Sequence, residues 1–155
     1  MDDKKLTEKA IRLAVENVAE GGGPFGAVLV TASGNEYDGT TLVTALNDPT
    51  APAEVQAIRA AAASEGFDLS GSTLFASCEP CPMCLTAALW ARVDRIVYAA
   101  TQDDAAAAGF DDASFYTQLH HGLKSVSDAE VTHLKLDDRR APFKAWEANP
   151  GHAEY

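Results

Sequence analysis

The sequence predicts an α/β protein in which helices pack on a partly parallel sheet. Segments whose apolar residues recur at helical spacing alternate along the chain with short apolar runs rich in β-branched residues. The chain has 155 residues, of which 46% are hydrophobic and 23% are charged, and these values are typical of a globular domain. A chain of this length can bury a core without disulfides. We therefore expect residues 1–155 to form a single domain.

The first half of the chain contains two predicted helices and a predicted β-hairpin. Residues 4–20 carry apolar side chains at helical spacing, and a Gly-Gly-Gly-Pro sequence ends that pattern. Residues 25–31 and 36–44 are predicted to be strands, because a Ser-Gly-Asn turn signal separates two runs with strand character. The second helix is predicted over residues 51–66 and begins near Pro52, since proline is tolerated in a first helical turn.

The second half of the chain continues the alternation of strands and helices. A buried strand is predicted at residues 72–77, a helix at residues 82–92 and another strand at residues 95–99. The four alanines at residues 105–108 are predicted to form a short helical turn. The last predicted elements are a strand at residues 126–136 and a helix at residues 142–148.

The charge of the chain limits the partners that it can bind. The formal net charge is −11 at pH 7, and such a charge repels nucleic acid and anionic lipid surfaces. The first residues mix both signs of charge and precede an amphipathic stretch, so we expect no secretory signal. No apolar run approaches the length of about 18 residues that would predict a membrane span. We therefore expect a cytoplasmic protein with a small-molecule partner, no nucleic acid and no membrane.

The three cysteines of the chain, Cys78, Cys81 and Cys84, lie close together in the sequence. Structural disulfides normally use an even number of cysteines spread along the chain, so this cluster indicates metal or redox chemistry. Cys81 and Cys84 form a Cys-x-x-Cys pair at the predicted start of a helix, where the helix dipole favours thiolates. A thioredoxin-type redox pair is one alternative, although the flanking Pro-Cys-Pro-Met-Cys sequence differs from that arrangement.

Glu54, upstream of the cysteines, distinguishes a hydrolytic zinc site from a redox pair. It falls in the first turn of a predicted helix, and without the cysteines it would be interpreted as a carboxylate favoured by the helix dipole. Zinc-dependent base deaminases carry a His-x-Glu sequence followed by Pro-Cys-x-x-Cys, with the glutamate moving protons. Glu54 matches this pattern, as do Pro80, Cys81 and Cys84. Pro52 stands where the pattern has histidine.

The chain resembles the guanine deaminase-like members of the cytidine/deoxycytidylate deaminase superfamily, which are zinc-dependent enzymes. The resemblance covers essentially the whole chain, in residues 23–28, 47–54, 78–84, 105–112 and 154–155. It implies a three-layer α/β/α fold with a five-stranded mixed sheet between helices. It also implies a homodimer in which residues 149–155 form an exchanged tail that closes the pocket of the partner.

The resemblance implies catalytic roles for four residues. Cys81 and Cys84 would bind Zn²⁺, and Glu54 would take a proton from the metal-bound water and return it to the leaving amine. The backbone after Glu79 would stabilise the charge that develops during the reaction.

The resemblance implies contacts between the base and further residues. Phe25 corresponds to an aromatic residue that lines the pocket, Asp112 to an acidic residue that binds the purine, and Tyr155 to the end of the exchanged tail. Thr41 stands where the family usually has an asparagine that hydrogen-bonds the base edge.

Two positions therefore depart from the family pattern. Pro52 replaces the third zinc ligand, and proline has no side-chain donor, whereas catalytic zinc sites normally have three protein ligands. Thr41 replaces a bidentate amide with one hydroxyl group, which removes a contact that reads the base. His152, in the C-terminal tail, is a candidate for the missing zinc ligand, and Cys78 is another candidate.

The sequence supports two main hypotheses of function. The first is zinc-dependent hydrolytic deamination of a purine-type nucleobase, guanine or a related aminopurine or nucleoside, with release of ammonia. The second is a non-catalytic protein of the same fold, which has lost its metal with Pro52 and binds a base or pairs with an active subunit. A third is that the cysteines and Glu54 serve other chemistry on this scaffold, because a fold does not fix a function.

Overall fold

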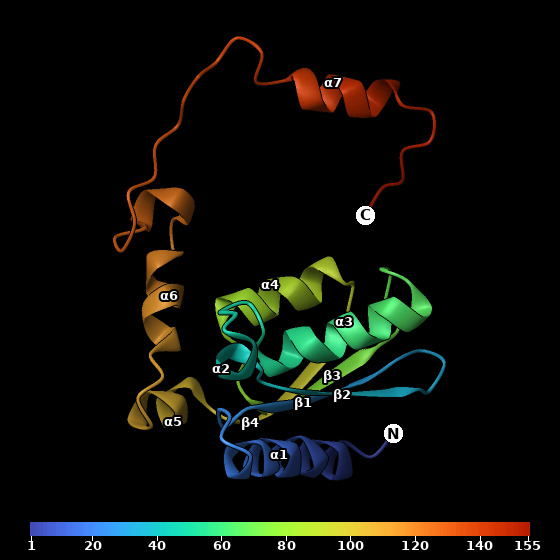
Figure 1. Ribbon diagram of the computed structural model, residues 1–155, viewed down its shortest axis with the longest axis vertical. Helices are drawn as coiled ribbons and strands as arrows, with labels where there is room; N and C mark the ends of the chain where they lie inside the picture. Colours follow the sequence, from blue (N-terminus) through green and yellow to red (C-terminus); the bar gives the residue numbers. More distant parts are fainter. The chain divides into compact units, whose positions relative to one another are not determined.

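A four-stranded mixed sheet forms the centre of the first part of the chain (Figure 1). The computed structural model describes all residues from 1 to 155, and these divide into two compact units, Met1–Thr117 and Gln118–Tyr155. β1 is antiparallel to both β2 and β3, whereas β3 and β4 are parallel. The strands are β1 (Gly26–Val30), β2 (Glu36–Thr40), β3 (Thr73–Cys78) and β4 (Arg95–Ala100), in the sheet order β2-β1-β3-β4.

Helices cover both faces of this sheet and give the first unit three layers. α1 (Asp3–Ala19) packs on one face, against β1 and β3 (Figure 1). α3 (Ala53–Glu65) packs on the other face, against β2 and β1, with α4 (Pro82–Trp90) beside it. α4 lies in the crossover that the parallel pair β3 and β4 requires. The shorter helices are α2 (Val43–Leu46), α5 (Gln102–Ala107) and α6 (Asp112–Gln118).

The two central strands, β1 and β3, are buried on both faces because each contributes side chains to two clusters. Val28 and Phe75 pack with Leu6 on the side of α1. Leu29 and Leu74 pack on the other side, with the small alanines of α3 and α4. Neighbouring residues of a strand point to opposite faces, so a strand covered on both sides is apolar throughout. This explains why β1 has no polar side chain and why β3 has the apolar residues Leu74, Phe75 and Ala76 at its centre.

Gly39 allows α3 to lie close to β2, and this fixes the helix that carries Glu54. A Cβ atom at Gly39 would overlap the carbonyl oxygen of Ala53 and lie 2.7 Å from the backbone nitrogen of Ala57. Gly39→Ala is therefore expected to lower the free energy of unfolding by about 1–3 kcal/mol, as overpacking does. Urea denaturation would measure this loss, with Thr40→Ala as the neighbouring control. Equal stability of Gly39→Ala and the unchanged protein would show that α3 can move away from the sheet.

The α/β class and the three layers predicted from the sequence are confirmed. The second strand of the hairpin is shorter than predicted, because the chain turns at Thr41 and forms α2. The prediction of a fifth strand at residues 126–136 is wrong, since the sheet has four strands and this segment forms none. The side chain of Gln118 accepts hydrogen bonds from the N–H groups of Ser127 and Asp128, so these groups are not available for a strand ladder.

The second unit, Gln118–Tyr155, contains little regular structure. Its elements are a 3₁₀ turn, η1 (Gly122–Ser125), and α7 (Ala141–Ala148), which matches the helix predicted at residues 142–148. α7 buries none of its residues. The exchange of residues 149–155 between subunits stays a prediction. No helix of the chain combines the length and the apolar character needed to cross a membrane.

Candidate active site

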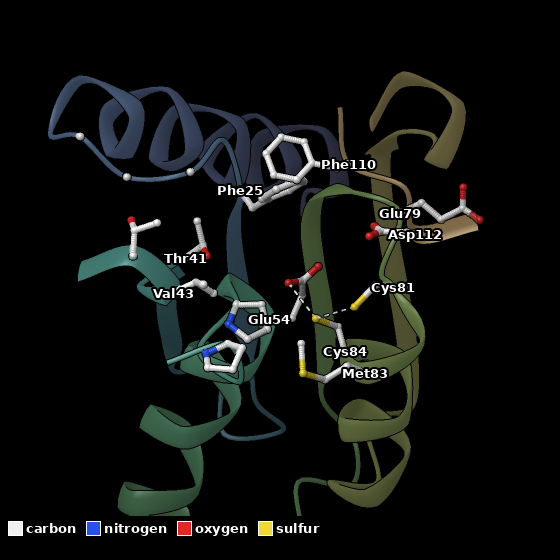
Figure 2. Close-up of a pocket in the computed structure, with 16 residues that line it drawn as sticks. Phe25, Thr41, Val43, Glu54, Glu79, Cys81, Met83, Cys84, Phe110 and Asp112 are labelled. Atoms are coloured by element: carbon white, nitrogen blue, oxygen red, sulfur yellow. Dashed lines mark hydrogen bonds between the residues drawn. The ribbon is translucent and has the colours of Figure 1, made fainter. Parts of the chain in front are cut away.

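A cavity of about 460 Å³ lies where loops and helix starts of the first unit meet (Figure 2). Its walls are the glycine loop after α1, the segment around Thr41, the start of α3, the start of α4, and the segment after α5. The cavity brings together seven residues that the sequence singled out in this unit, together with Pro52. They are Phe25, Thr41, Glu54, Glu79, Cys81, Cys84 and Asp112.

Glu54 points into the cavity from the first turn of α3 (Figure 2). Its side chain is buried, and its Oε2 accepts a hydrogen bond from the Cys84 thiol over 3.3 Å. Burial raises the pKa of this carboxyl group above its ordinary value, against smaller effects of the hydrogen bonds to it. A buried carboxyl group with a raised pKa can both accept and return a proton near neutral pH.

The two cysteines that the sequence predicts as metal ligands lie at the start of α4. Cys81 is the N-cap residue and Cys84 lies in the first turn, with their sulfur atoms 3.6 Å apart. The hydrogen bond with Cys84 lowers the pKa of Cys81 to about 7. The same hydrogen bond and burial raise the pKa of Cys84. One thiol of the pair is therefore poised to ionise, and a bound cation would favour ionisation of both.

The cysteine pair fits zinc, whereas the wall beside it has no third ligand. Tetrahedral zinc with bonds of about 2.3 Å to sulfur holds two thiolates about 3.8 Å apart, close to the separation of Cys81 and Cys84. Pro52, the N-cap residue of α3, lines the same cavity and offers only methylene groups. No group of three or more His, Cys, Asp and Glu side chains in the chain is arranged to hold a metal ion.

Two aromatic rings and a threonine form the wall opposite the cysteines (Figure 2). The rings of Phe25 and Phe110 meet edge to face, with 4.9 Å between their centroids. Thr41 is buried, and its carbonyl oxygen accepts a hydrogen bond from the amide of Asn17 over 3.0 Å. The same amide group binds the carbonyl oxygen of Gly23 over 2.9 Å. Asn17 therefore ties the glycine loop to the segment that carries Thr41.

The two remaining acidic residues of the cavity differ in their surroundings. Burial, and then the neighbouring Asp111, raise the pKa of Asp112 above its ordinary value. The carboxylate of Glu79 accepts hydrogen bonds from the backbone N–H of Gln102 over 2.9 Å and from its side-chain amide over 3.4 Å. The Glu79 side chain therefore binds the first residue of α5, and it points away from Glu54 (Figure 2). Pro80, which follows it, has no N–H group.

Residues that the sequence analysis did not single out also shape the cavity. Phe110 and Met83 line it, and the hydroxyl group of Tyr116 donates a hydrogen bond to the carbonyl oxygen of Pro80 over 2.6 Å. Tyr116 thereby fixes the segment that leads to Cys81. An aromatic residue close in sequence to Asp112 was the signal available for Phe110, but its pairing with Phe25 joins segments distant in the chain.

His152 and Tyr155 belong to the second unit, and their predicted roles stay predictions. The ring of His152 stacks on Trp146, with 4.6 Å between centroids, and its Nδ1 lies 2.8 Å from the carbonyl oxygen of Asn149. Tyr155 is exposed. Cys78 is buried in the first unit, and burial raises the pKa of its thiol to about 11. Its thiol donates a hydrogen bond to the carbonyl oxygen of Thr101, so it is less ready to ionise than Cys81.

A layered α/β unit with a buried glutamate beside a Cys-x-x-Cys helix start defines the class of zinc-dependent base deaminases. Residues 1–100 match the family model described as "Cytidine and deoxycytidylate deaminase zinc-binding region". The chain belongs to this family of cytidine and deoxycytidylate deaminases.

Among its relatives is the guanine deaminase of Bacillus subtilis, which is 42% identical over the whole length of both chains. The crystal structure of a guanine deaminase from Bacillus subtilis covers the whole chain with a TM-score of 0.93. A guanine deaminase of Nitrosomonas europaea, 34% identical, covers 69% of this chain and 63% of its own, with a TM-score of 0.64. The tRNA-specific adenosine deaminase of Haemophilus influenzae is 38% identical over 81% of this chain and 74% of its own.

Proposed function

We propose that the chain is a hydrolytic deaminase of a purine-type nucleobase and that it releases ammonia. The observation that carries this proposal is the buried Glu54 carboxyl group, 3.3 Å from the Cys84 thiol in a cavity with aromatic walls. The identity to guanine deaminase over the whole chain supports a purine base as substrate. The chain has no cationic side chain in this cavity, so a small neutral base suits it better than tRNA.

Different residues of the cavity would bind zinc, transfer protons and stabilise charge in this reaction. Cys81 and Cys84 would hold zinc, which lowers the pKa of bound water toward neutrality when it is present. Glu54 takes a proton from the attacking water and returns it to the leaving amine, because its burial raises its pKa and makes it a stronger base than an exposed carboxylate. Because Pro80 has no N–H group, Cys81 carries the first backbone N–H after Glu79 that can stabilise developing charge.

Other residues would hold the base itself. Phe25 packs against the face of the ring, together with Phe110. Asp112 accepts hydrogen bonds from N–H groups of the base, and Thr41 contributes one hydroxyl group to its edge. His152, in the C-terminal tail, stays the candidate for the third zinc ligand, and we place the protein in the cytoplasm.

A second function, binding of a base without catalysis, is favoured by Pro52 alone. An assay of the purified protein distinguishes the deaminase from the base-binding protein. The protein is supplied with zinc, and ammonia release is measured with guanine and a panel of aminopurines. Ammonia release that disappears in Cys81→Ser supports the deaminase. Binding without ammonia release, with less than about a tenth of an equivalent of zinc, would leave only the base-binding function. Loss of zinc in His152→Ala would assign the third ligand, and unchanged zinc would exclude it.

We also propose that the protein is a homodimer that exchanges its C-terminal tails. The second unit exposes large apolar side chains, among them Leu123, Leu134, Phe143 and Tyr155, and such a surface normally has a partner. Light scattering is expected to give twice the chain mass of 16.4 kDa. Mixed dimers of Glu54→Gln and a chain without residues 149–155 should regain activity, because one tail completes the intact pocket of the other chain. A monomeric mass would contradict this arrangement.

A further inference from the structure

Asn17 is the one polar residue that α1 buries, and its side chain joins two segments of the cavity wall. Asn17 itself is not among the residues that line the cavity. Its amide nitrogen donates hydrogen bonds to the carbonyl oxygens of Gly23 and Thr41, over 2.9 and 3.0 Å. Both N–H groups of the amide are therefore used, and this fixes the orientation of the side chain. Asn17 thus sets how the glycine loop and the segment around Thr41 lie relative to each other.

The glycine loop is shaped to fit around Asn17. The backbone carbonyl oxygen of Asn17 accepts a hydrogen bond from the N–H group of Gly22 over 2.8 Å. A Cβ atom at Gly22 would overlap the amide nitrogen of Asn17, and a Cβ atom at Gly23 would lie 2.9 Å from the methyl carbon of Thr41. Glycine at both positions therefore lets the loop approach the Asn17 amide and the Thr41 methyl group closely.

These contacts determine where the hydroxyl group of Thr41 lies. Thr41 lines the cavity (Figure 2), and its hydroxyl group makes no hydrogen bond within the chain. Its backbone is held on both sides, because its N–H group donates to the carbonyl oxygen of Phe25 and its carbonyl oxygen accepts from Asn17. Threonine is stiff at χ1, so a fixed backbone and a packed methyl group also fix the direction of the hydroxyl group.

We infer that Asn17 is a positioning residue, which holds the Thr41 hydroxyl group where it binds the ligand of the cavity. The Asn17 amide acts through Thr41, because its own N–H groups are engaged with backbone carbonyl oxygens. Without this amide two carbonyl oxygens lose their partner, and the glycine loop no longer holds the Thr41 methyl group in place. The inference rests on the proposed function in taking a purine base as the ligand.

A double-mutant cycle on the metal-free, full-length protein tests the inference, with binding of the fluorescent base 2-aminopurine as the measurement. Thr41→Val removes the hydroxyl group and should lower the affinity about 3–10-fold, the effect of one hydrogen bond. Asn17→Ala should lower the affinity by a similar factor. When Thr41→Val is already present, Asn17→Ala should change the affinity less than about twofold, because the group that Asn17 positions is absent.

Two further variants separate positioning from a general loss of stability. Leu6→Ala is the matched control, since Leu6 is buried in the same helix and lies outside the cavity. It should lower the unfolding temperature and leave the affinity unchanged. Gly22→Ala displaces the Asn17 amide without removing it, and it should lower the affinity as Asn17→Ala does. It replaces Asn17→Ala in the cycle if that variant does not fold.

Equal effects of Asn17→Ala with and without Thr41→Val would overturn the inference, as would a comparable loss of affinity in Leu6→Ala. The absence of 2-aminopurine binding by the unchanged protein would overturn it too.

Ammonia release is measured separately, in the presence of zinc, so the inference and the proposed function can fail independently. Coupled affinities without ammonia release support the inference and contradict the deaminase, and additive affinities with ammonia release do the reverse. In a protein that releases ammonia, Asn17→Ala should raise KM severalfold and leave kcat unchanged, because Glu54 and the cysteine pair lie on other helices. A lower kcat with an unchanged KM would contradict the positioning role.

Discussion

Pro52→His is expected to raise the zinc affinity of this protein by about a hundredfold or more. The variant places an imidazole at the start of α3, in the wall that faces Cys81 and Cys84, and so completes a three-ligand set. Even the groups that only orient zinc ligands change affinity by about 10–100-fold when they are removed, so a direct ligand should have at least this effect. Pro52 has φ −69° and ψ 165°, which histidine adopts without strain. Competition with a chelator of known affinity measures the change.

Deamination should increase together with zinc binding in Pro52→His. A third ligand fixes the metal beside Glu54, and we expect ammonia release from an aminopurine to rise by about a hundredfold at limiting zinc. Pro142→His, in α7, serves as the control for a histidine added elsewhere. If the unchanged protein already holds one zinc per chain and gains nothing from the substitution, a ligand from another part of the protein completes the site. His152→Ala would then be the variant to examine.

The fold was predictable from the sequence where local signals agree with the packing. The apolar residues of β1 and of the centre of β3 identified buried strands, and a proline near the start of each helix marked where α3 and α4 begin. The fifth strand was mispredicted because an alternating pattern is a local property, whereas a strand needs a partner at its edge. Gln118 occupies two of the N–H groups that such a partner would have used.

The candidate site was predictable where its residues lie at helix starts. Glu54, Cys81 and Cys84 each fall in or next to the first turn of a helix, and both helices pack on the same face of the sheet. Sequence spacing could not reveal that Phe110 meets Phe25, because the chain between them passes through most of the fold. It also could not reveal that the Glu79 carboxylate is held by α5, since this contact depends on where β4 ends.

Glu54→Gln is expected to lower kcat by about 10²–10⁴-fold and to leave KM for the base almost unchanged. Glutamine has nearly the same shape and can still meet the Cys84 thiol, but it cannot take a proton from water. The comparison is made in the unchanged protein, or in Pro52→His if that variant is the more active. Parallel loss of kcat and gain of KM would indicate that Glu54 only shapes the cavity.

The stability of the same variant separates a catalytic role from a structural one. Burial raises the pKa of Glu54 in the folded, metal-free protein, so the folded state loses stability as the pH rises above the unfolded pKa. Glu54→Gln removes this cost, and at pH 7 with a chelator it should unfold at the same temperature as the unchanged protein or at a higher one. Glu65, at the other end of α3, should behave in the opposite way. Hydrogen bonds from Asn35 and Tyr37 lower its pKa, so Glu65→Gln should lose stability at pH 7 and keep its activity. A Glu54→Gln protein that unfolds well below the unchanged protein would make the carboxylate a structural group.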